Sequence, residues 1–253
     1  MTIVAVAGDC CTTTTVALAA AWPRADETVL MEADPSGGDL AAWFDMPVSP
    51  SLSAVVTRVL SGGWAEIDRF TRLSPSGLRL VPAPANAAEA QQAIAESTRR
   101  IVDTVAAPTA PIVFVDTGRF LQPVHPFVAA ASVTVLVHRQ APQSARAAAV
   151  RLQRLADQIE SGQANHGGVV VAVVGAAPFD LGEVEEFLVD VVDSAPVIGL
   201  PVDALAAATY AGRAGVAARR LARLPLSRAA RDLAAAVALA RPDPAALSTR
   251  SGW

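Results

Sequence analysis

The segment VAVAGDCCTTTTVALAAAW, residues 4–22, places one glycine and four consecutive threonines directly behind an apolar run. This order predicts a strand, a tight turn at Gly8 and a helix that the threonines open. Backbone N–H groups at the start of such a helix can bind phosphate, and a threonine hydroxyl there can bind Mg²⁺. The lysine that phosphate-binding loops use is missing, because the chain contains no lysine anywhere.

Acidic residues stand at the ends of three other apolar runs. Ligands bind outside the carboxyl ends of the strands in an open parallel sheet. We therefore expect these residues to lie at the same edge of the sheet as the glycine turn. They are Asp34 behind 28–33, Asp116 near the end of 111–117, and Pro201 with Asp203 behind 195–201.

The elements that must position these residues alternate along the chain. Nearly all-apolar strands between longer helices predict an α/β fold: a doubly wound, mostly parallel sheet with helices on both faces. Residues 45–77 are rich in Ser, Pro and Gly, and we expect an excursion with short helices. Strands are predicted at 3–7, 28–33, 78–83, 111–117, 133–138, 168–175 and 195–201, and helices at 13–22, 86–105, 142–160, 181–191, 203–211 and 226–240.

Length and composition set further bounds. The 253 residues are 52% hydrophobic and 17% charged, which predicts one large domain over 1–253 with a frayed tail from about 242. The net charge of −4 argues against a protein that is basic overall. The longest apolar run, 126–137, is too short to span a bilayer, and Asp9 interrupts the N-terminal apolar run, so we expect no signal peptide and a cytoplasmic protein.

The order and spacing of the motifs resemble the MinD/ParA family of P-loop ATPases over nearly the whole chain. The family's K-G-G-x-G-K-T-T motif falls on Ala7 to Thr14, and its D-x-D-P-Q-G motif falls on EADPSGGDL, with Glu32 and Asp34 at the acidic positions. A strand that ends D-T-P falls on IVFVDTGRF, and P-x-D falls on Pro201 to Asp203. The resemblance implies the fold of a P-loop NTPase, with ATP or ADP and Mg²⁺ as cofactors.

The resemblance also implies roles for individual residues. Thr13 and Asp116 would serve the Mg²⁺ ion, and Asp34 would orient the attacking water as the catalytic residue. A helix cap formed by Asp34 with Ser36 and Asp39 is the alternative interpretation. The nucleotide itself would be bound by Gly8, Asp9, Cys10, Cys11, Thr12, Thr13, Thr14, Pro201 and Asp203.

Several positions of the loop depart from the family pattern. Ala7 and Thr12 replace its two lysines, and Asp9 adds a negative charge beside the expected phosphates. The altered loop is similar to that of the CpaE/TadZ group. We therefore expect a pseudo-ATPase with weak or no hydrolysis, acting with a homodimer or protein partner in bacterial partitioning or in placing a pilus or secretion assembly. An active Mg-dependent ATPase switch and a nucleotide-independent scaffold or DNA-binding protein are the alternatives.

Arginines gather near the C-terminus ahead of the first acid of that segment. A solvated face, nonspecific DNA binding, and docking to anionic membrane or an acidic partner all remain open. On helical spacing, several of these arginines roughly share a face, although Pro225 must break the run. The alanine-rich stretch 226–240 predicts a packing helix and no membrane anchor. The arginines are Arg213, Arg219, Arg220, Arg223, Arg228 and Arg231.

The two cysteines, Cys10 and Cys11, are adjacent and are not expected to bridge. A zinc site would need further ligands at suitable spacing. We predict two small, buried loop residues, and a helix N-terminus leaves the reactivity of one thiol open.

Overall fold

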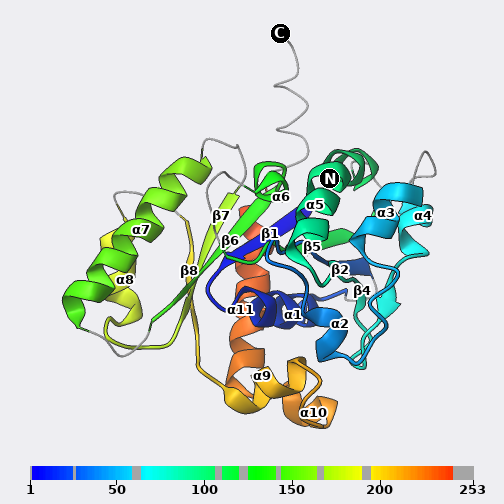
Figure 1. Ribbon diagram of the computed structural model, residues 1–253. Coiled ribbons are helices and arrows are strands. Elements are labelled where there is room, and N and C mark those ends of the chain that lie inside the picture. Colours follow the sequence, from blue (N-terminus) through cyan, green and yellow to red (C-terminus); the bar gives the residue numbers. More distant parts are fainter. Residues whose placement is uncertain are drawn as a thin grey trace.

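Eight strands form one sheet in the computed structural model, which describes residues 2–24, 27–58, 64–105, 110–119, 125–140, 144–163, 168–189 and 195–241. The strand order is β3-β4-β2-β5-β1-β6-β7-β8 (Figure 1). Every neighbouring pair is parallel except β3 with β4. The strands are β1 Ile3–Gly8, β2 Thr28–Glu32, β3 Arg72–Leu73, β4 Arg79–Val81, β5 Ile112–Asp116, β6 Val133–Arg139, β7 Gly168–Val174 and β8 Val197–Leu200.

Helices cover both faces of this sheet (Figure 1). One face packs against α3 (Leu52–Arg58), α4 (Trp64–Asp68), α5 (Ala87–Val105), α6 (Pro126–Ala129), α7 (Ala145–Gln163) and α8 (Leu181–Leu188). The other face packs against α1 (Cys11–Ala21), α2 (Leu40–Trp43), α9 (Ala204–Tyr210), α10 (Ala218–Leu221) and α11 (Pro225–Ala240). The doubly wound fold expected from the alternation is therefore confirmed.

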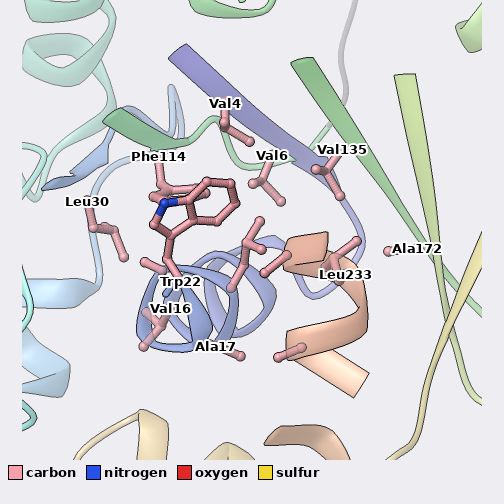
Figure 2. Close-up of a cluster of buried hydrophobic side chains, with 14 of the residues drawn as sticks. Val4, Val6, Val16, Ala17, Trp22, Leu30, Phe114, Val135, Ala172 and Leu233 are labelled. Atoms are coloured by element: carbon pink, nitrogen blue, oxygen red, sulfur yellow. The ribbon is translucent and has the colours of Figure 1, made fainter. Parts of the chain in front are cut away.

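The central strand β1 explains why the apolar runs are nearly continuous. Its odd-numbered residues join the hydrophobic cluster on one face, and Val4 and Val6 join the cluster on the other. Figure 2 shows this second cluster, where Trp22 behind α1 meets Phe114 of β5 edge-on, with ring centroids 5.3 Å apart. Burial of each large apolar side chain stabilises the fold by about 1.5–3 kcal/mol. The packing fixes α1, and with it the turn in front of it.

Differences from the sequence-based elements are confined to short segments. The excursion at 45–77 contains the expected short helices, α3 and α4, and also β3, which pairs antiparallel at the sheet edge. A two-residue strand is too short to leave a periodic pattern. Among the described helices, none is long and apolar enough to cross a membrane. The frayed tail expected from about 242 lies outside the described residues.

Candidate functional site

The turn between β1 and α1 has the geometry of an anion-binding loop. Gly8 has φ +118°, and a Cβ atom there would lie 2.2 Å from the carbonyl oxygen of Val137 in β6, so only glycine fits. Cys10 is left-handed at φ 54° and precedes α1 without a side-chain cap. The first N–H groups of α1 are therefore left for an anion or water.

The threonines that open α1 divide into two pairs. Thr12 and Thr13 are partly exposed, whereas Thr14 and Thr15 are buried. The Thr15 hydroxyl donates to the carbonyl of Cys11 over 2.9 Å, and the N–H of Thr14 donates to the carbonyl of Cys10. The hydroxyls of Thr12 and Thr13 are thus the ones within reach of a ligand, and Thr14 supports the turn from inside.

Asp116 ends β5 as a fully buried carboxylate. Its Oδ1 accepts from the N–H of Gly118 at 3.1 Å, while its Oδ2 has no hydrogen-bond partner among the described residues. Burial raises the pKa of Asp116, and the nearby side chains of Cys11 and Thr12 act to lower it. A buried carboxylate oxygen without a hydrogen-bond partner is suited to bind a water molecule or an ion.

Asp34, which follows β2, lies against the backbone of Gly118. A Cβ atom on Gly118 would be 2.3 Å from the Asp34 carboxyl carbon, so this glycine permits the close approach. The Oδ1 of Asp34 accepts from the N–H of Ser36 at 2.7 Å. The charge of Asp34 also contributes to the raised pKa of Asp116, which places the two carboxylates in one electrostatic neighbourhood.

Glu32, the last residue of β2, holds the helix that Asp34 was alternatively expected to cap. Its Oε1 accepts from the N–H groups of Asp39 and Leu40 at 2.7 and 3.0 Å, and its Oε2 accepts from Ala83 at 3.0 Å. Burial raises the pKa of Glu32 to about 7, and the charge of Asp116 adds to this. The cap at the start of α2 therefore comes from Glu32, because its carboxylate accepts the N–H groups of Asp39 and Leu40.

The mouth of the loop carries guanidinium groups that sequence reasoning missed. The Oδ2 of Asp9 lies 3.2 Å from Nη2 of Arg151 in α7 and accepts from the backbone N–H of Arg139 at 3.3 Å. Nη1 of Arg139 is 4.0 Å from Sγ of Cys10. The chain has no lysine to place here, but two arginines lie at the mouth. Arg139 directly follows the apolar run 133–138, and this position could have predicted that it lies at the same edge of the sheet.

Solved structures share this fold. MinD of Pyrococcus horikoshii with Mg-ADP has a TM-score of 0.70 at 12% identity, covering 99% of each chain. MinD of Pyrococcus furiosus has a TM-score of 0.72 at 13% identity, covering 94% of this chain and 98% of its own. A ParA-family ATPase of Chlorobium tepidum has a TM-score of 0.65 at 14% identity, covering 92% of this chain and 97% of its own. No family model matches the sequence, and a search of curated proteins found no match.

This chain has the MinD/ParA fold. The fold explains why the predicted motifs lie along one edge of the sheet. At identities of 12–14%, the likeness shows the fold alone, so the chemistry of the site depends on the residues of this chain.

In this MinD/ParA fold, the side of the site formed by Asp116 and Thr13 suits a magnesium nucleotide, and the phosphate side does not. The unpartnered Oδ2 of Asp116 and the partly exposed Thr13 offer oxygen atoms of the kind that Mg²⁺ binds directly or through water. No cluster of three His, Cys, Asp or Glu side chains in the described ranges could hold a metal, so Mg²⁺ would depend on phosphate and water oxygens. On the phosphate side, Asp9 stands where the family pattern has glycine.

Asp203 braces two helices of the MinD/ParA fold. Its Oδ1 accepts from the N–H of Ala206 in α9 at 3.0 Å, and its Oδ2 accepts from the N–H of Leu226 in α11 at 3.3 Å. Both carboxylate oxygens are thus used within the protein. Contact of Pro201 and Asp203 with a nucleotide stays a prediction.

The two cysteines face different environments, so the prediction that both are buried is wrong for Cys10. Cys10 is exposed because its left-handed backbone turns it outward, whereas Cys11 is buried. The Cys11 thiol donates to the carbonyl of Val6 at 2.8 Å. Burial, and next the charge of Asp116, raise the pKa of Cys11 well above its ordinary value.

The six arginines near the C-terminus do not share one helix. All of them are exposed, but they are divided between the segment after α9, the four-residue α10 and its end, and the first two turns of α11. Pro225 is the first residue of α11, which is why helical spacing fails across it. Arg213 lies over the ring of Trp43 at 5.9 Å, and Arg231 donates to the carbonyl of Ala222 at 3.1 Å.

Proposed function

We propose that this protein is a MinD/ParA-like P-loop protein that binds Mg²⁺ and ATP or ADP weakly and hydrolyses ATP slowly or not at all. The supporting observation is the contrast within one loop. Gly8 and the uncapped start of α1 keep the shape of a phosphate cradle, but Thr12 stands at the lysine position and Asp9 at the mouth.

The residues of the chain take the following roles in this proposal. The first N–H groups of α1 bind the phosphates, and Thr13 with Asp116 holds the ion or its water. Asp34 orients a water molecule toward the terminal phosphate. A bound Mg²⁺ would neutralise phosphate charge. Without a lysine, little else stabilises the charge that moves during phosphoryl transfer, so we expect turnover to be negligible.

Titration calorimetry with Mg·ATP and Mg·ADP tests the proposal. We expect dissociation constants weaker than about 100 μM, because losing a few kcal/mol of phosphate contacts costs two or more decades in affinity. Thr13→Ala should weaken the remaining binding, and phosphate release should not exceed that of this variant. Low-micromolar binding of Mg·ATP, or nucleotide that survives purification, would contradict the proposal.

We further propose a cytoplasmic role in spatial organisation, through a homodimer or a protein partner. The solved neighbours include a MinC:MinD cell division complex of Aquifex aeolicus and McdA of Cyanothece in complex with ATP. The process that we propose is chromosome or plasmid partitioning, or placement of a pilus or secretion assembly. Sedimentation with and without Mg·ATP tests for a dimer. Nonspecific DNA binding by the exposed arginines stays a prediction, to be tested by retardation of random duplex DNA at about 50 mM salt.

A further inference from the structure

A cavity of about 800 Å³ lies at the opposite end of α1 from the phosphate loop. It is lined by residues of the end of α1, the turn at Pro75 and Ser76, the end of α9, the segment behind α9, α10 and the start of α11. With 11 residues, α1 separates its two ends by about 16 Å. The cavity is therefore a place distinct from the loop, and its volume lies in the range of small-molecule sites.

The charged lining of the cavity has one sign. Arg213 and Arg231 line it, and no Asp or Glu occurs among the described residues that do so. Arg231 gives one hydrogen bond, to the carbonyl of Ala222, and so uses a small part of its five N–H donors. Two guanidinium groups, with no carboxylate among the described lining residues, attract a negatively charged ligand and pair readily with phosphate or carboxylate oxygens.

The buried wall of the cavity contains a hydroxyl proton that is free to donate a hydrogen bond. The hydroxyl oxygens of Tyr210 and Ser227 are 2.8 Å apart, and both side chains are buried. Two hydroxyls carry two protons, and only one proton can lie between the oxygens. The other has no acceptor among the described residues. A buried O–H without an acceptor costs free energy, so this wall favours a ligand oxygen or a water.

Apolar side chains complete the cavity, among them Ala20 and Ala21 of α1, Val216, and Leu221 of α10. We propose that this cavity binds a small organic phosphate monoester. Its phosphoryl group meets Arg213, Arg231 and the free hydroxyl proton of the Tyr210–Ser227 pair, and its apolar body lies against α1 and α10. This proposal does not depend on nucleotide binding at the phosphate loop.

Phenyl phosphate is a suitable probe because it joins an apolar ring to a phosphate monoester. We expect it to bind with a dissociation constant of about 1 mM or tighter, and inorganic phosphate and phenol to bind at least about tenfold more weakly, since each offers half of the contacts. Amide spectra should show shifts at Gly212, Ala214 and Gly215. No binding of phenyl phosphate, or equal binding of inorganic phosphate, would overturn the proposal.

Matched variants decide where the probe binds. Arg231→Gln should weaken phenyl phosphate at least about tenfold, as expected for the loss of a charged hydrogen bond. Arg228→Gln, the same charge change at an exposed position of α11 outside the cavity lining, should leave the affinity within about twofold. Equal losses in both would show general electrostatic attraction and overturn the proposal.

Two further variants separate this site from folding and from the loop. Tyr210→Phe combined with Ser227→Ala keeps both arginines and removes both hydroxyl protons, so it should weaken phenyl phosphate without disturbing the Arg231 contact to Ala222. Thr13→Ala at the loop should leave phenyl phosphate binding unchanged. If Thr13→Ala abolishes it, the anion occupies the loop and the proposal is overturned. Failure of the wild-type protein to bind Mg·ATP would count against the proposed function alone.

Discussion

The two sides of the candidate site differ in how deeply they are built into the fold. On the carboxylate side, Glu32 and Asp116 are at most 1% exposed, and Glu32 ties β2 to α2 and to Ala83. On the phosphate side, Asp9 and Arg151 form an ion pair at the rim whose side chains are a little more than one-third exposed. The hydrogen bonds of Glu32 hold the fold whether or not a ligand binds, whereas the Asp9 carboxylate, among the described residues, bonds only to the two arginines of the rim. Acidic motifs on the carboxylate side are therefore weak evidence for nucleotide binding by themselves.

The alkylation rates of the two adjacent cysteines should show the largest difference between the two sides. Cys10 is exposed on the phosphate side, and Cys11 is buried near Asp116 on the carboxylate side. Cys10 stands at the exposed mouth near Arg139, and Cys11 lies beneath it with a raised pKa. The thiolate is the reactive form, so iodoacetamide at pH 8 should alkylate Cys10 on the order of 100-fold faster. Peptide mass spectrometry of Cys10→Ser and Cys11→Ser single variants measures both rates. Similar rates would mean that the two sides open together.

Glu32 should make folding stability fall as pH rises. Its pKa goes from 4.5 to about 7 in the folded protein, so the favourable protonated state is fully present below pH 4.5 and is lost as pH rises toward 7. This loss amounts to about 3 kcal/mol. Urea unfolding of Glu32→Gln should lack that part of the pH dependence.

Glu186→Gln, at an exposed carboxyl on α8, provides the control for this titration. Its unfolding free energy should follow that of the wild-type protein at every pH. If Glu32→Gln also follows the wild-type curve between pH 4.5 and 7, the carboxylate side is less sealed than its burial indicates.

Restoring the family loop tests whether the carboxylate side still suits a metal nucleotide. Asp9→Gly, Cys11→Gly and Thr12→Lys together should tighten Mg·ATP binding at least about tenfold, or about 1.4 kcal/mol, because Thr13, Asp34 and Asp116 are already in place. Calorimetry of the triple variant measures this gain, and adding Thr13→Ala should remove it. A folded triple variant that ignores ATP would reduce the resemblance to one of fold.

The sequence predicted the fold far better than the rim of the site. Apolar runs such as 3–7 and 168–175 report burial on both faces, which is a local property, and every strand expected from such a run is present. The contacts of Asp9 with Arg151 join residues 142 positions apart and leave no local pattern. The contacts of Glu32 with Ala83 and of Asp203 with Leu226, 51 and 23 positions away, were missed for the same reason. The capping donors Asp39, Leu40 and Ala206 lie within eight positions, so these caps were missed although their contacts are local.

The ion pair between Asp9 and Arg151 should give the smallest effect, because both side chains are more than one-third exposed. A double-mutant cycle with Asp9→Asn and Arg151→Gln should find a coupling below about 1 kcal/mol that shrinks with added salt. The more exposed pair Arg24–Glu27 serves as a matched control and should couple no more strongly. A coupling above about 2 kcal/mol, outside the range of exposed pairs, would show that the rim is as firmly built as the carboxylate side. Asp9 would then be a structural residue of the loop, and its replacement by glycine would have to be judged first by folding and only then by nucleotide affinity.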